Sequence, residues 1–197
     1  MIVPLHYQVS EYDCVPTTFI NAIAWLYERR AIPPLVIRHI YAYCLDTVSR
    51  GGRLGRAGTS KYAIQLVGHW LASYKTRVFS VGTEYLEPQE VHLRPEGPIW
   101  RALENGGLAL CNIHLGHKEW HFVLGLHHDD GWLYVFDPYL RTQVHRLKDK
   151  VRLLKPGTGR EPNLAVRMEW LDRGGGRGRY TFGEVPQREC LLLWRVK

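Results

Sequence analysis

The spacing of the hydrophobic residues changes near residue 76, and this change limits the possible folds more than any other feature of the chain. Before it, apolar residues recur at helical spacing over residues 14–29, 35–45 and 61–74. After it, apolar and other residues alternate with the period of two that β-strands show. Helices followed by strands favour an α+β fold with an antiparallel sheet.

The length of 197 residues is that of one domain large enough to bury a hydrophobic core. We therefore expect a single domain over residues 1–197, with a helical part over about 1–75 and a β-rich part over about 76–197. The sequence has no signal-peptide pattern and no run of apolar residues long enough to span a membrane. Its four cysteines form no CxxC pair. These features predict a cytoplasmic protein with reduced thiols and no cofactor.

The formal net charge of +7 and the isoelectric point of about 9.3 could attract an anionic partner. The arginines, however, are spread along the chain, and no nucleic-acid-binding motif accompanies them. We therefore expect no nucleic-acid partner. His114, His117 and His121 with Cys111 offer ligand types that suit zinc, but a strand-turn-strand arrangement would not bring them together, and we expect no metal site.

Turn residues divide the second half of the chain into short segments. Asp129-Asp130-Gly131 lies between two β-like runs and predicts a tight antiparallel hairpin. The glycine-rich segments 51–58 and 174–178 are expected to be loops. The expected strands cover residues 76–81, 108–114, 120–127, 132–137, 142–147, 163–170 and 189–196, and a short helix is expected over 95–105.

A cysteine stands where a polar loop meets the first predicted helix. Cys14 would occupy the first helical turn, and Pro16 suits that turn because its missing N–H needs no partner there. The positive end of the helix dipole and the free N–H groups favour a thiolate at this position. Gln8, six residues upstream, could donate its amide to an oxyanion beside the sulfur. Cys14 is therefore a candidate nucleophile.

Two further candidates lie on the predicted hairpin. His121 is early in one strand and Asp137 ends the next, so the two can meet on adjoining strands. A thiol, an imidazole and a carboxylate together make a nucleophile, a base and a group that orients the base. The sequence thus predicts a Cys14–His121–Asp137 triad.

These motifs, taken together, resemble the peptidase C39 family of papain-like cysteine peptidases. The family has a glutamine six positions before the cysteine, a helix start similar to Asp-Cys-Gly-Pro-Thr, a His-Tyr/Phe-Val-Val strand and an Asp-Pro after the next strand. This chain matches with Gln8, with Asp13-Cys14-Val15-Pro16-Thr17, with His121-Phe122-Val123-Leu124 and with Phe136-Asp137-Pro138. Val15 departs from the usual glycine, and the chain beyond about residue 150 has no counterpart in the pattern.

The resemblance implies a papain-like fold and a cysteine peptidase or amide hydrolase that acts on a peptide or protein through a thioester. It implies Cys14 as nucleophile, His121 as base, Asp137 as the residue that orients the base, and Gln8 as oxyanion donor. Two alternatives remain open. One is a transpeptidase or acyltransferase that uses the same triad, and the other is a peptide- or leader-binding module that does not cleave, which the unusual Val15 keeps open.

Overall fold

The computed structural model describes residues 2–117, 119–144, 147–155, 159–174 and 178–196. Helices occupy the first part and an antiparallel sheet the second, so the predicted α+β class is confirmed. Among the described residues, no helix is both long and apolar enough to cross a membrane. The helical elements are α1 (Cys14–Leu26), η1 (Arg29–Ala31), α2 (Pro34–Tyr43), α3 (Lys61–Ser73), η2 (Pro88–Glu90), α4 (Pro98–Glu104), α5 (Met168–Leu171) and η3 (Val185–Gln187).

The starts of the predicted helices agree closely with the observed ones because local signals define them. Pro34 begins α2, where its fixed backbone angle suits the first helical position. Ser60 caps α3, and its side chain accepts a hydrogen bond from the Ala63 N–H at 3.2 Å. The first helix ends at Leu26, three residues before the predicted end, since the backbone of Tyr27 is extended.

Strands in the described part of the chain form one seven-stranded sheet in the order β1-β7-β2-β3-β4-β6-β5. All neighbouring strands are antiparallel, and the C-terminal strand β7 lies between β1 and β2. The strands are β1 (Val81–Tyr85), β2 (Leu108–Gly116), β3 (Glu119–Asp129), β4 (Trp132–Phe136), β5 (Val151–Leu153), β6 (Leu164–Arg167) and β7 (Cys190–Arg195).

The predicted hairpin between β3 and β4 is confirmed. Asp129 pairs with Trp132, and the two residues between them have positive φ angles, +44° at Asp130 and +74° at Gly131. A two-residue hairpin turn of this kind needs left-handed backbone at both positions, which glycine and aspartate tolerate best. The turn fixes the register that carries His121 and Asp137.

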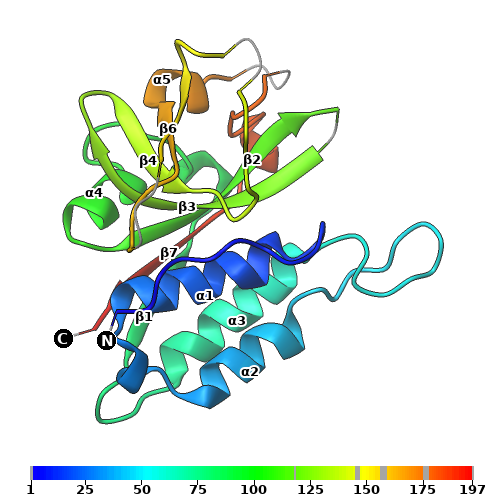
Figure 1. Ribbon diagram of the computed structural model, residues 1–197, viewed down its shortest axis with the longest axis vertical. Helices are drawn as coiled ribbons and strands as arrows, with labels where there is room; N and C mark the ends of the chain where they lie inside the picture. Colours follow the sequence, from blue (N-terminus) through cyan, green and yellow to red (C-terminus); the bar gives the residue numbers. More distant parts are fainter. Residues whose placement is uncertain (1, 118, 145–146, 156–158, 175–177, 197) are drawn as a thin grey trace.

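The sheet separates two hydrophobic cores (Figure 1). Helices α1, α2 and α3 lie together on one side, where Phe19 and Ile23 of α1 share a core with Phe122 and Leu124 of β3. Residues of the opposite parity, such as Val123, face a second core that α4 and α5 help to close. Helix α1 therefore packs directly against β3, a central strand of the sheet.

Three strand predictions were wrong in part. Over 76–81 the chain makes a tight turn in which Thr76 Oγ1 accepts the Phe79 N–H at 3.1 Å, and β1 starts only at Val81. Residues 142–144 have no regular structure, and 145–146 lie outside the described residues. The segment predicted over 163–170 leaves the sheet after Arg167 and continues as helix α5.

The glycine-rich segment 51–58 is a loop, as predicted, with an isolated bridge between Val48 and Leu54 at its base. Of the second glycine-rich segment, residues 175–177 lie outside the described residues.

Candidate active site

The loop before α1 is folded around the Asp13 carboxylate. Its oxygens accept hydrogen bonds from the backbone N–H of Val9 at 3.0 Å and of Ser10 at 2.7 Å, and from the Ser10 hydroxyl at 2.7 Å. Burial acts to raise the pKa of Asp13, but these hydrogen bonds hold it below its ordinary value. The loop places Cys14 at the first position of α1, where its side chain is partly exposed. The other three cysteines are buried.

His121 of β3 and Asp137, just after β4, are in direct contact. The His121 Nε2 lies 2.6 Å from Asp137 Oδ1, and both side chains are buried. Leu124 pairs with Phe136 at the end of the ladder, and Asp137 follows directly, so its carboxylate lies within contact distance of His121 on β3. The sixteen-residue interval thus brings the imidazole and the carboxylate together, as the sequence predicts.

Cys14 completes the group from the helical side. With Nε2 bound to Asp137, the Nδ1 atom of the imidazole remains for the sulfur. Burial lowers the pKa of His121, but the hydrogen bond and charge of Asp137, together with a hydrogen bond to Cys14, outweigh it and raise the pKa to about 9. The imidazole is therefore protonated at neutral pH, as a thiolate–imidazolium pair requires.

Asp137 is fully buried and has hydrogen-bond partners on both oxygens. Oδ1 also accepts the Tyr139 N–H at 2.8 Å, and Oδ2 accepts Arg141 Nε at 2.9 Å. Burial acts to raise the pKa of this carboxyl, but the hydrogen bonds and charges of His121 and Arg141 outweigh burial and hold the pKa below its ordinary value. Asp137 therefore remains charged. The Asn163 side chain binds both the N–H and the C=O of Asp137, at 2.7 and 2.8 Å. Sequence reasoning missed Arg141 and Asn163.

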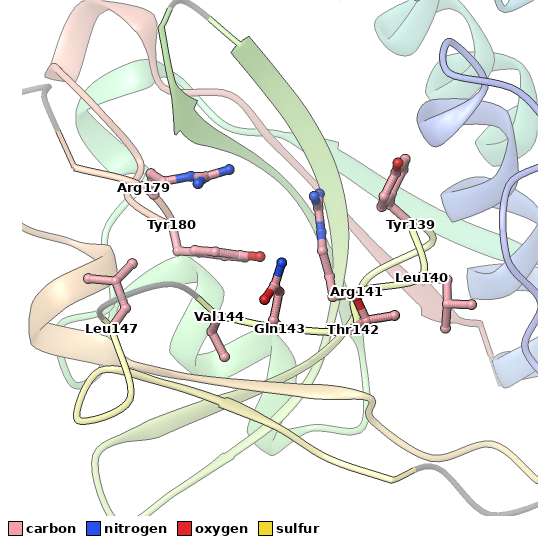
Figure 2. A pocket seen from close by; sticks show the side chains of 9 residues that line it. All are labelled: Tyr139, Leu140, Arg141, Thr142, Gln143, Val144, Leu147, Arg179 and Tyr180. Atoms are coloured by element: carbon pink, nitrogen blue, oxygen red, sulfur yellow. The ribbon is translucent and has the colours of Figure 1, made fainter.

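Arg141 links the buried carboxylate to a small polar pocket of about 170 Å³ (Figure 2). Its guanidinium lies 4.4 Å from the centre of the Tyr139 ring. Figure 2 shows the side chains of Gln143, Arg179 and Tyr180 around the same space. Arg141 thus binds Asp137 through Oδ2, while His121 contacts Oδ1 of the same carboxylate.

Gln8 lies in the same loop as Asp13, but its amide has another partner. The Nε2 donates to the Ser10 carbonyl at 2.6 Å, while the buried Oε1 has no hydrogen-bond partner among the described residues. The Gln8 backbone N–H donates to the Pro138 carbonyl at 2.8 Å, which ties the loop to the residue after Asp137. The role of Gln8 as oxyanion donor stays a prediction.

A cleft of about 420 Å³ opens beside the sulfur. Residues 57–61, between the first glycine-rich loop and α3, form part of its wall. Val15 also lines it, as expected from its place beside Cys14, although its side chain is almost fully buried. The cleft is lined by Cys14, Val15, Ala57, Gly58, Thr59, Ser60, Lys61, Asn112, Trp120, Phe122, Gln187 and Glu189.

The residues considered for a metal site point to different partners. The Cys111 sulfur faces Cys190 at 3.8 Å, and His114 Nδ1 lies 3.1 Å from the Gly178 carbonyl oxygen. His121 binds Asp137. In the part of the chain that the structure describes, no three histidine, cysteine or acidic side chains are grouped as a metal site would need.

Neither a known protein family nor a curated protein was found to match this chain. The residues of the site themselves therefore carry the functional argument.

The raised pKa of His121 predicts how stability depends on pH. Folded His121 binds its proton more tightly than an unfolded histidine, whose pKa is near 6.5. The contact with Asp137 should therefore stabilise the fold fully below pH 6.5, and this contribution should disappear as the pH rises through about 9. Urea unfolding at pH 6 and pH 9.5 measures the change.

His121→Gln should show a smaller loss of stability between pH 6 and pH 9.5 than the unmodified protein does. His69→Gln, at an exposed position on α3, is the matched control and should keep the full loss. An identical pH dependence in the unmodified protein and His121→Gln would contradict the assignment of this contribution to His121.

Proposed function

We propose that this protein is a cysteine peptidase or amide hydrolase that acts on a peptide or protein substrate, with a papain-like fold similar to that of the C39 peptidases. The observation that carries the proposal is the contact of 2.6 Å between His121 Nε2 and Asp137 Oδ1, beside a partly exposed Cys14 at the start of a helix. A buried histidine with a raised pKa next to a cysteine is the arrangement that activates a thiol.

Each residue has a defined step in the proposed reaction. The Cys14 sulfur attacks the carbonyl carbon of the scissile amide, and a C–S bond forms as the oxygen takes negative charge. The C–N bond then breaks, and His121 gives its proton to the departing amine, which leaves a thioester on Cys14. Water attacks the thioester and loses a proton to His121. The C–S bond breaks, the acid product leaves, and the Cys14–His121 pair is restored.

The negative oxygen of the tetrahedral intermediate needs donors close to the sulfur. We assign this role to the backbone N–H of Cys14, in the first turn of α1, and to the Gln8 amide. For Gln8 this requires that its Nε2 turn from the Ser10 carbonyl toward the bound substrate, or use its second N–H. Asp137 keeps the imidazole in its orientation and stabilises its positive charge.

The charged groups behind the site favour catalysis over simple peptide binding. A buried carboxylate that binds both a histidine and an arginine is costly to desolvate, and a binding module has no need of it. Acyl transfer to an amine would use the same thioester and needs no separate site. Incubation of peptides with and without added amines decides whether the acceptor is water or an amine.

Peptides that carry an electrophilic ketone in place of the scissile carbonyl test the proposal. One equivalent should attach to each chain, and peptide mapping by mass spectrometry should find it on Cys14. Urea-unfolded protein is the control, and its Cys14 should react no faster than its other three cysteines. A folded protein in which no probe modifies Cys14 would count against a hydrolase. Incubation of cleavable peptides with and without added amines then identifies the acceptor.

A further inference from the structure

The cleft beside Cys14 contains two acceptor groups that the proposed reaction does not use. Asn112 of β2 and Glu189, just before β7, come from neighbouring strands, and the Asn112 N–H donates to the Glu189 carbonyl at 3.0 Å. Their side chains meet as well, since Asn112 Nδ2 lies 3.4 Å from Glu189 Oε2. Because the sheet holds both backbones, the two side chains form a fixed polar patch within reach of the sulfur.

Asn112 offers an acceptor without a donor. The residue is 7% exposed, and its buried Oδ1 has no hydrogen-bond partner among the described residues. Buried side-chain oxygens in folded proteins are almost always hydrogen-bonded, so this unpaired oxygen at the cleft wall marks a missing donor, which a ligand would supply after a small rotation of the amide. The direction of its amide is fixed in part by Nδ2, which faces the Glu189 carboxylate.

Glu189 adds negative charge to the same patch. Its carboxyl is partly buried, and burial raises its pKa, against the opposing effects of Asn112 and Lys61. Lys61 also lines the cleft and its charge acts on Glu189, but its side chain is exposed, and the ion pairs among the described residues do not include one between Lys61 and Glu189. A partly desolvated carboxylate without a bound cation attracts a cationic ligand.

We propose that this patch, Asn112 and Glu189, binds a lysine or arginine side chain of the substrate close to the scissile bond. The inference rests on the proposed hydrolase function and names the substrate class for it. The Glu189 carboxylate and Asn112 Oδ1 would both accept from the cationic group. The rings of Trp120 and Phe122, which line the cleft, would cover its aliphatic stem.

Peptides in which one position at a time holds arginine, norleucine or glutamate test the inference, with positions on both sides of the cleaved bond varied. Product analysis by mass spectrometry identifies the bond cleaved and gives kcat/KM for each peptide. At one position arginine should exceed norleucine by about 10- to 100-fold, the range for a hydrogen bond to a charged group. Glutamate should be the poorest residue there.

Two variants connect the preference to the patch. Glu189→Gln keeps the shape of the side chain and should reduce the ratio of arginine to norleucine to about 3-fold or less, while Glu189→Lys should favour glutamate instead. Glu184→Gln, an exposed residue of the preceding segment, is the matched control and should keep the full ratio. Thermal unfolding shows whether each variant is folded.

The outcomes separate this inference from the proposed function. Cleavage with no preference for a basic residue at any position, or a preference that survives unchanged in Glu189→Gln, would overturn the inference alone. No cleavage of any peptide together with no probe on Cys14 would overturn the hydrolase and the inference with it.

Discussion

Cys14→Ala is expected to reduce turnover of a cleavable peptide to background, a loss of about 10⁶-fold if the sulfur forms the thioester. Without the sulfur no C–S bond can form, and the remaining groups can only bind and polarise the substrate. The side chain is partly exposed at the start of α1, so its loss leaves no large cavity in either core. Progress curves with a cleavable peptide measure the rate, and thermal unfolding checks the fold.

Cys44→Ala is the matched control for removal of a thiol. Cys44 is buried at the end of α2, and burial raises its pKa to about 12, which makes it a poor nucleophile. This variant should keep its turnover and lose about 1 kcal/mol of stability. Full activity in Cys14→Ala would end the proposal that Cys14 is the nucleophile.

Asp137→Ala should lower kcat by roughly 10³-fold or more, because the imidazole loses the group that fixes its orientation and stabilises its charge. It should also cost about 3–5 kcal/mol of stability, since a partly buried Arg141 is left without its carboxylate. Urea unfolding and peptide turnover measure the two effects on the same preparations.

Asp129→Ala removes an exposed carboxylate from the far end of the same hairpin and is the matched control. It should leave turnover within about twofold and change stability by about 0.5 kcal/mol or less. If Asp137→Ala folded and retained its kcat, Asp137 would be only a structural partner of Arg141. Asp137→Asn keeps an oxygen that can accept a hydrogen bond from His121. It should therefore lower kcat less than Asp137→Ala does.

The features of the fold that could be predicted from the sequence are those that short stretches of the chain specify. The starts of α2 and α3 follow from Pro34 and Ser60, and the hairpin follows from a turn that needs left-handed backbone at Asp130 and Gly131. Each of these features is decided within a few residues of the chain. The α+β class follows in turn, because it depends only on where helical spacing gives way to alternation.

Features that depend on distant segments were missed. Strand β7 lies between β1 and β2, a pairing that joins the end of the chain to its middle, and no local pattern specifies it. One local signal was missed as well: the Thr76 hydroxyl accepts the Phe79 N–H and forms a turn within the strand predicted over 76–81. Helix α5 likewise replaced the end of a predicted strand.

In the site, too, residues placed by local signals could be predicted, and residues placed by contacts between distant segments could not. Cys14, His121 and Asp137 could be proposed from the sequence because a helix start and a hairpin fix their places, and the structure shows His121 in contact with Asp137. Arg141 and Asn163 support Asp137 from irregular segments, and an arginine or asparagine in a loop carries no signal of its contact. Asn112 was missed because it lies among the apolar residues of β2.

The most direct measurement compares the rate at which iodoacetamide alkylates Cys14 at pH 6 in the unmodified protein and in His121→Gln. Labelling of Cys14 ahead of the other cysteines proves little, because Cys44, Cys111 and Cys190 are at most 5% exposed. If the His121 imidazolium holds Cys14 as a thiolate, alkylation should slow at least about tenfold in His121→Gln and stay unchanged in His69→Gln. Equal rates in the unmodified protein and His121→Gln would contradict the thiolate–imidazolium pair.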